Sequence, residues 1–213
     1  MRQIEIAFFD IDGTLHHGET LWEIIHKKNG TWDTLGISYW EAFLAGRIDY
    51  PTFARLDVKA WEGFRESEFK EALREVSLFT EAIQVFNTLR ESGTLTYLIS
   101  NGIAQLADHI VTLHGLTGYV ANPVHIENGR LTGEITLSLP YHGKGVEVQR
   151  LLAEHDVKSE NALAVGDSPG DFSMFEQVGH PIYLTYDKAA PATYSGFLAR
   201  SWKDIVDYVD TRS

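Results

Sequence analysis

Two carboxylates, Asp10 and Asp12, follow a short apolar segment, Ile4–Phe9, with one residue between them. Side chains alternate along a strand, so both carboxylates point to one side of it and Ile11 points to the other. Like charges held this close repel each other unless a cation or a shared proton compensates them. The pair therefore indicates a chemical site, although Asp12-Gly13 alone is also an ordinary turn signal.

Two further segments place polar side chains where a predicted strand ends. In LISNGIA, Ser100 ends a strand and Asn101-Gly102 precedes a helix opening at Ile103, whose unpaired N–H groups suit a phosphate. In AVGDSPGD, Asp167 leaves a strand and Asp171 follows four residues later. Together with the first pair, these residues would bring four carboxylates to one edge of a sheet. That arrangement is strongly unfavourable without a metal ion.

Lys144 stands between two glycines in the segment YHGKG. A phosphate-binding loop of the Walker type would need glycine at Ser138 and a hydroxyl residue at Gly145, so that motif is excluded. A lone lysine is usually a surface charge. Lys144 is a candidate functional residue only if the fold places it beside the acidic residues.

The elements that must position these residues follow from apolar patterning. Helical patterns separate several short apolar segments, and the clearest helix begins with Thr80 as its expected N-cap and closes at Gly93. This alternation predicts an α/β fold: a Rossmann-like parallel sheet with helices on both faces. Asn128-Gly129 predicts the turn of one β-hairpin. The predicted strands are Ile4–Phe9, Leu95–Ile99, Tyr119–Ala121, Ala162–Val165 and Pro181–Leu184.

Residues 16–79 have a different character, with several helical patterns and no convincing strand. Asp49 is placed to cap one of these helices, with Pro51 in its first turn. Four of the five tryptophans lie in this segment and would give it a core of its own. We therefore expect an inserted α-helical domain over residues 16–79, with residues 1–15 and 80–213 forming the α/β core.

Composition narrows the class of partner. The chain has 213 residues, and its 18 Lys and Arg against 30 Asp and Glu give a formal net charge of −12, which disfavours nucleic acid and anionic membranes. The absence of cysteine excludes disulfides, zinc–thiolate sites and thiol nucleophiles. The N-terminal segment lacks the features of a signal peptide or a membrane span. We expect a cytoplasmic protein; no residue pattern predicts an oligomeric state.

At this point the chain resembles a known family. DIDGTL from Asp10, SNG from Ser100, Lys144 and GDSPGD from Gly166 look like the four motifs of the haloacid dehalogenase superfamily of phosphohydrolases, in order and over nearly the whole chain. The helical insertion after the first motif, together with the phrases ENGRLTGEI and DFSMF, resembles its phosphoserine phosphatase-like branch, which carries a helical cap.

The resemblance implies a role for each motif residue. Asp10 would be the nucleophile that becomes an aspartyl phosphate, and Asp12 would protonate the leaving alcohol and later activate water. Mg²⁺ would be the cofactor, held by the Asp10 and Asp167 side chains and the Asp12 carbonyl. Ser100 and Lys144 would bind the phosphate oxygens, and the backbone near Gly13, Asn101 and Gly102 would contact the phosphate as well. Asp171 would orient Lys144 or the metal-bound waters.

The cap departs from the branch it resembles. Glu19 matches the acidic residue that meets the substrate amine in phosphoserine phosphatases, and Tyr50 matches an apolar wall position. The arginine that grips the substrate carboxylate falls at Asp57, a reversal of charge. Arg55 is two residues away, about 200° around a helix, and should face elsewhere. We expect phosphoserine to be a poor substrate for this reason, and an ester bearing an amine or hydroxyls to be a better one.

The predicted function is therefore Mg²⁺-dependent hydrolysis of a small phosphomonoester through an aspartyl phosphate, with a substrate preference that is not strictly for phosphoserine. One alternative is a phosphoserine phosphatase. Another is a phosphotransferase or phosphomutase that passes the same phosphoryl group to a hydroxyl. A phospho-receiver signalling domain also clusters Asp, Ser or Thr, and Lys on a parallel sheet, but the second acidic pair and the large insertion do not suit it.

Overall fold

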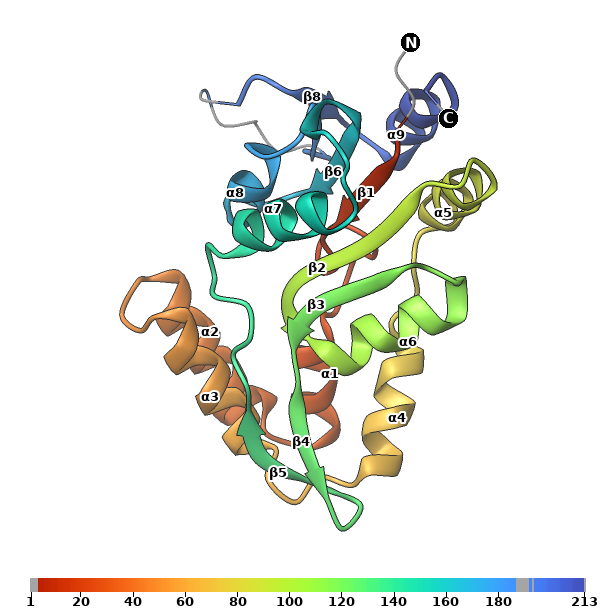
Figure 1. Ribbon diagram of the computed structural model, residues 1–213. Coiled ribbons are helices and arrows are strands. Elements are labelled where there is room, and N and C mark those ends of the chain that lie inside the picture. Colours follow the sequence, from red (N-terminus) through yellow and green to blue (C-terminus); the bar gives the residue numbers. More distant parts are fainter. Residues whose placement is uncertain (1–3, 187–191, 193, 213) are drawn as a thin grey trace.

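The computed structural model describes residues 4–186, 192 and 194–212 (Figure 1). Within this part, a six-stranded sheet has the order β3-β2-β1-β6-β7-β8, and all its neighbouring strands are parallel. The predicted α/β fold is confirmed. The strands are β1 (Ile6–Phe9), β2 (Leu95–Ile103), β3 (Gly118–Asn122), β6 (Ala162–Gly166), β7 (His180–Leu184) and β8 (Phe197–Ala199).

Both faces of the sheet are buried, as a parallel sheet requires. Along β1, Ala7 and Phe9 join the core formed with α5 (Thr80–Glu91), α6 (Ala104–His114) and α9 (Trp202–Asp210). Ile6 and Phe8 point the other way and join the core formed with α7 (Lys144–Glu154) and α8 (Phe172–Phe175). Two short 3-10 helices, η2 (Ser159–Asn161) and η3 (Pro169–Asp171), flank β6. In the strand order, β1 lies between β2 and β6. The residues that follow β1 therefore lie near the middle of the sheet edge.

The segment after β1 folds into helices that lie beyond this edge (Figure 1). Asp49 caps α3 as predicted, because its Oδ1 accepts a hydrogen bond from the Thr52 N–H at 2.9 Å. A π-helical turn links the first two helices of the group. The elements are α1 (Leu21–Lys28), η1 (Trp32–Gly36), α2 (Ile37–Leu44), α3 (Tyr50–Ala60) and α4 (Glu66–Glu75).

The hairpin forms as predicted, from β4 (Val124–Glu127) and β5 (Arg130–Ile135). Asn128 and Gly129 have φ values of 50° and 73°, which suit a tight turn. The hairpin reaches the helical segment, because the N–H of Leu131 donates to the Phe64 carbonyl at 2.9 Å. It therefore packs beside α3, away from the six-stranded sheet (Figure 1).

Two local predictions are wrong. Thr80 is the first residue of α5, and its side chain forms no capping bond. β2 does not end at Ser100 but continues to Ile103, with a register shift against β3 between Ile99 and Ile103. Ser100 and Gly102 thus lie within the distorted end of a strand.

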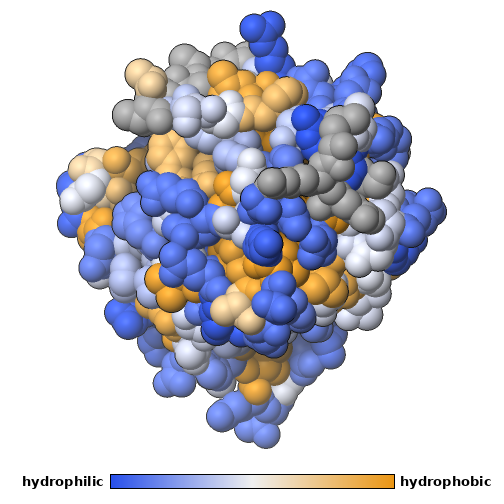
Figure 2. Space-filling view, turned by 45° about the horizontal axis from the view of Figure 1, so that its top comes forward, coloured by the Kyte–Doolittle hydropathy of each residue, from blue (hydrophilic) through white to orange (hydrophobic). Residues whose placement is uncertain are grey.

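The described helices include none that is both long enough and apolar enough to cross a membrane. On the face shown in Figure 2, hydrophilic side chains predominate and hydrophobic ones form separate areas between them. This agrees with the acidic composition of the chain.

Candidate active site

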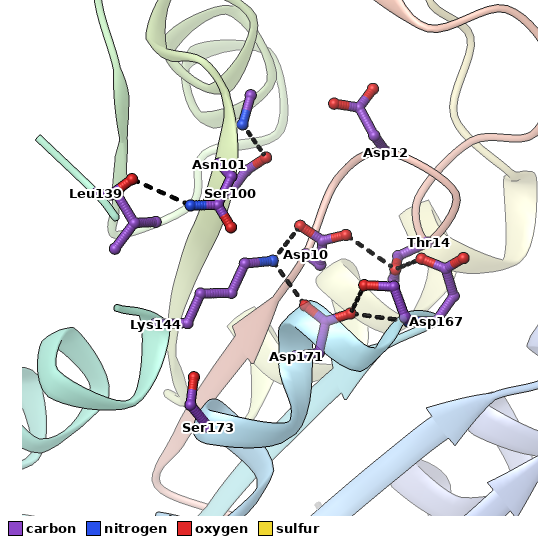
Figure 3. A network of polar contacts seen from close by, with 12 residues as sticks. Asp10, Asp12, Thr14, Ser100, Asn101, Leu139, Lys144, Asp167, Asp171 and Ser173 are labelled. Atoms are coloured by element: carbon purple, nitrogen blue, oxygen red, sulfur yellow. Dashed lines mark hydrogen bonds and ion pairs between the residues drawn. The ribbon is translucent and has the colours of Figure 1, made fainter. Parts of the chain in front are cut away.

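A buried lysine joins two of the predicted acidic residues. Lys144 opens α7, and its Nζ lies 2.5 Å from Asp10 Oδ1 and 2.6 Å from Asp171 Oδ1 (Figure 3). Asp10 follows β1 and Asp171 ends η3, so three elements that are distant in the sequence meet here. All three side chains are buried. The structure thus places Lys144 beside the acidic residues, so this lysine is a candidate functional residue and not a surface charge.

Asp171 is held by its own loop. Its second oxygen, Oδ2, accepts hydrogen bonds from the Asp167 N–H at 3.2 Å, and from the Ser168 N–H and Oγ at 3.0 Å each. With Oδ1 bound to Lys144, both oxygens are occupied by protein donors. This arrangement suits an orienting role for Asp171, as the sequence predicts.

Asp167 approaches Asp10 through Thr14. The Thr14 hydroxyl donates to Asp167 Oδ1 at 3.0 Å and lies 3.4 Å from Asp10 Oδ2. Gly13 explains how the carboxylate comes so close to the chain. It has φ +80°, and a Cβ at this position would lie 2.6 Å from Asp167 Oδ2. Gly13 is therefore required both for the turn and for the close approach of Asp167.

The acidic cluster carries more negative charge than the protein compensates. Oxygens of Asp10, Asp167 and Asp171 lie within 4.8 Å of one another. Burial raises the pKa of Asp10 to about 8; Lys144 opposes this, and the other two carboxylates add to it. Burial lowers the pKa of Lys144, but Asp10 and Asp171 raise it more strongly, so the amine stays charged. One cation against three carboxylates, all oxygen donors, fits a divalent metal ion bound between Asp10 and Asp167.

Removing metal should make stability depend on pH through Asp10. Its pKa in the folded protein, about 8, lies above the ordinary value of 3.8, so the folded state holds a proton that the unfolded state has lost between these values. The free energy of unfolding of the metal-free protein should therefore fall as pH rises through this window. Thermal melts in EDTA at about pH 5 and about pH 8 measure the fall. Mg²⁺ should restore the loss at the higher pH, and Asp10→Asn should have a smaller pH dependence than wild type. Equal pH dependence of the two proteins would contradict the raised pKa.

Ser100 faces the cluster from the neighbouring strand. It is buried, and its Oγ accepts a hydrogen bond from the Gly102 N–H at 3.0 Å. Asn101 also lines the cavity, and its side-chain amide donates to the carbonyls of Leu139 and Pro140 at 3.1 and 3.0 Å. The Asn101 side chain therefore fastens the segment before α7, and the structure does not direct its amide to a phosphate.

Asp12 is turned away from the Lys144 cluster (Figure 3). Its Oδ1 lies 3.0 Å from Nε2 of His16, a buried side chain. A Cβ on Gly102 would lie 2.8 Å from Asp12 Oδ2, so only glycine leaves room for the carboxylate there. The two carboxylates that start the chain's first motif thus have separate surroundings, as two different chemical roles require.

These residues lie at one end of a cavity of about 480 Å³. Asp10, Asp12, Ser100 and Lys144 line its polar end. The rest of the wall is largely aromatic and comes mostly from the helical segment: Trp22, Trp32, Trp40, Phe43, Tyr50, Phe53 and Tyr141. Lys144 is the only Lys or Arg among the described residues that line the cavity. Tyr50 lies in the wall, and its hydroxyl donates to the Asn101 carbonyl.

Asp57 also lines this cavity, where it is 2% exposed. A solvated position for this residue is thereby excluded. Its Oδ1 lies 3.0 Å from Nε2 of the fully buried His26, close enough for an ion pair, although the two atoms lack the alignment of a hydrogen bond. Burial raises the pKa of Asp57, and His26 opposes the shift. Arg55 is exposed and lines a different groove, as its position on the helix predicts.

Glu19 does not reach the cavity. Its side chain is 53% exposed and lies 2.5 Å from Lys27 Nζ. The predicted contact between Glu19 and a substrate amine is therefore not supported by this structure. Glu23, one helical turn further along, lines the cavity instead, and its carboxylate lies 2.7 Å from Lys27 Nζ.

Sequence reasoning missed several contributors. Thr14 could have been identified from the sequence, because it belongs to the first motif. His16 stands in a loop of polar residues, and His26 lies within an ordinary amphipathic helix. Neither histidine can be paired with its aspartate from sequence spacing alone, because both pairings arise from folding of the segment after β1.

Comparisons with known proteins agree with this geometry. A sequence model of the haloacid dehalogenase-like hydrolase family matches residues 7–176. The chain is 27% identical over 172 residues to the phosphoserine phosphatase of Idiomarina loihiensis, covering 80% of this chain and 77% of that protein. It is 27% identical over 213 residues to the phosphoserine phosphatase of Lactococcus lactis, covering 96% and 95% of the two chains.

The fold has close counterparts among solved structures. A substrate-bound phosphoserine phosphatase complex superimposes with a TM-score of 0.84 at 20% identity, covering 98% of this chain and all of the other. At this identity, the likeness concerns the fold.

Proposed function

The chain belongs to the haloacid dehalogenase-like hydrolase family, whose sequence model spans residues 7–176, and from this premise we propose that it hydrolyses a small-molecule phosphomonoester with Asp10 as nucleophile. The observation that carries the proposal is the contact of Lys144 with Asp10 and Asp171 at the polar end of the cavity. These groups would face a phosphate at its floor, with room above for the leaving group.

In the first half of the proposed reaction, an oxygen of Asp10 forms a bond to phosphorus while the bond from phosphorus to the alcohol oxygen breaks. The electron pair of the broken bond stays on the alcohol oxygen, which takes a proton from Asp12. Lys144 and Ser100 bind the other phosphate oxygens and offset their charge. The product of this half is an aspartyl phosphate and a free alcohol.

In the second half, water attacks phosphorus and gives a proton to Asp12, and the bond between phosphorus and Asp10 breaks. Inorganic phosphate leaves, and both carboxyl groups return to their first state. A bound divalent cation, which we propose is Mg²⁺, supplies positive charge that reduces repulsion between the Asp10 carboxylate and the phosphate. Asp10, Asp167 and the Asp12 carbonyl would hold it.

Phosphoserine is the first candidate substrate. The relatives named above are phosphoserine phosphatases, and they favour this alternative over our expectation that phosphoserine is a poor substrate. In this chain, the substrate carboxylate would need a partner other than Asp57.

The cavity wall supports a second candidate. Asp57 and Glu23 are acidic, Lys144 is engaged by two carboxylates, and the remaining wall is mostly aromatic. Aromatic faces and carboxylates attract an ammonium group. This favours an ester whose alcohol carries an amine and no carboxylate.

The test is phosphate release with Mg²⁺ from a panel containing phosphoserine, phosphoethanolamine, phosphocholine and small polyol phosphates. The highest kcat/KM with phosphoserine would support the first candidate. The highest value with an amine ester, reduced in Asp57→Asn, would support the second. The exposed residue Asp33 offers a control, since Asp33→Asn should leave the order of the panel unchanged. Absence of Mg²⁺-dependent release from every ester would contradict the proposed function.

We further propose that residues 16–79 act as a cap that closes over the sheet edge. Its two connections to the core run side by side, because the Phe79 N–H donates to the Leu15 carbonyl at 2.9 Å. A pair of adjacent connections suits a hinge.

A cytoplasmic location remains a prediction from composition.

A further inference from the structure

His16 contacts the carboxylate that the proposed reaction uses as its acid. Its ring Nε2 lies 3.0 Å from Asp12 Oδ1, and the residue is 2% exposed. Within the part of the chain that the structure describes, this ring is the only side chain hydrogen-bonded to the Asp12 carboxylate. The contact is therefore the one polar restraint that the described side chains place on Asp12.

The backbone fixes where the ring stands. The N–H groups of Thr14 and Leu15 both donate to the Ile11 carbonyl, at 3.1 and 2.9 Å, and form a tight turn. A backbone bridge pairs Asp12 with His16 across this turn. The ring is thus returned to Asp12 by local structure and held there by burial.

The other side of the carboxylate is confined as well. Asp12 Oδ2 lies so close to Gly102 that a Cβ there would be 2.8 Å away. Gly102 and His16 thus confine the carboxylate from two sides. The Asp12 carboxylate points away from Lys144 and Asp10 (Figure 3). Asp12 and Gly102 both line the cavity, and Oδ2 is the Asp12 oxygen that lies next to Gly102.

We propose that His16 is a positioning residue for the acid–base step: it holds Asp12 so that Oδ2 meets the alcohol oxygen of the substrate. The inference rests on the proposed function. A carboxylate that turns about its Cβ–Cγ bond loses alignment with the leaving oxygen, and proton transfer requires hydrogen-bond distance and direction. His16 acts through Asp12 and has no contact with phosphate in this role.

The leaving group provides a specific test. Alkyl phosphates need a proton on the departing oxygen, whereas p-nitrophenyl phosphate releases a stabilised anion without one. The ratio kcat/KM reports the steps up to the first irreversible one, here formation of the aspartyl phosphate, and so excludes the later attack by water. A defect in positioning Asp12 should therefore lower kcat/KM for alkyl esters only.

The experiment measures kcat/KM for the best alkyl ester of the panel and for p-nitrophenyl phosphate, both with Mg²⁺. His16→Leu should lose on the order of 10²-fold with the alkyl ester and less than about threefold with p-nitrophenyl phosphate. His16→Gln retains a donor and should recover part of the loss. Asp12→Asn should show the same selectivity as His16→Leu. His17→Gln is the matched control, because His17 is exposed and lies against Tyr186 instead.

Equal losses on both esters, or no loss on either, would overturn the inference while leaving the proposed function intact. The proposed function fails separately, if wild type releases no phosphate with Mg²⁺ or if Asp10→Asn is as active as wild type. Should His16→Leu not fold, His16→Gln and His16→Asn decide the question by the same comparison of esters.

Discussion

Replacing Asp10 with Asn is expected to abolish turnover while leaving the fold intact. The amide has nearly the shape of the carboxylate, but it cannot attack phosphorus, and loss of a nucleophile commonly lowers kcat by a factor on the order of 10⁴ or more. The amide oxygen of the variant side chain can still accept a hydrogen bond from Lys144, whose Nζ lies 2.5 Å from Asp10 Oδ1 in the wild type. Steady-state phosphate release with Mg²⁺ measures the loss, and a thermal melt checks the fold.

A matched control for this variant is Asp156→Asn. Asp156 is exposed and has φ 53°, a conformation that asparagine accepts readily. This control should retain the activity of wild type. If Asp10→Asn retained it too, another residue would have to be the nucleophile and the proposed mechanism would be wrong.

Replacing Lys144 with Met should have the second largest effect. Lys144 is the cation of the cluster, and its removal leaves the buried carboxylates of Asp10 and Asp171 without their shared partner. Lys144 lowers the pKa of Asp10, so without this lysine less of the nucleophile is ionised at a given pH. A phosphate in the cavity would also lose its principal cationic contact. We expect kcat/KM to fall by a factor on the order of 10³.

The measurement for Lys144→Met is kcat/KM as a function of pH. Activity that remains should rise with pH over a higher range than in wild type, because ionisation of Asp10 needs a higher pH. Lys203→Met is the control, since Lys203 is 77% exposed and pairs with Asp207 on the surface. A Lys144 variant within about tenfold of wild type would mean that other groups bind the phosphate.

The sequence predicted the sheet and the polar residues at its edge, for identifiable reasons. Parallel strands buried on both faces leave long apolar signals, and motif residues at their ends stand out against them. β8 has three residues, too few for such a signal. The continuation of β2 through Ser100 also escaped prediction, because Asn101-Gly102 suggests a turn, whereas β2 pairs with β3 again at Ile103.

The cap was harder to predict residue by residue. Asp57 lines the cavity at the position that matches the family's arginine, but its pairing with His26 depends on how α1 and α3 pack. Glu19 was placed in the site by its match to an acidic residue of phosphoserine phosphatases; in the structure it precedes the capping residue of α1, Thr20, and turns outward to Lys27. Spacing along the chain locates core motifs well, because strands fix direction. It locates residues at the start of an insertion poorly, because the chain changes direction there.

The most direct test of the central claim is a crystal structure with beryllium fluoride and Mg²⁺. Beryllium fluoride mimics a phosphoryl group on a carboxylate, so we expect beryllium bonded to an Asp10 oxygen, with fluorines contacting Lys144 and Ser100. The metal should lie between Asp10 and Asp167, whose oxygens already lie within 4.8 Å of each other. Density for the adduct on another residue, with Lys144 directed to solvent, would contradict the proposed mechanism.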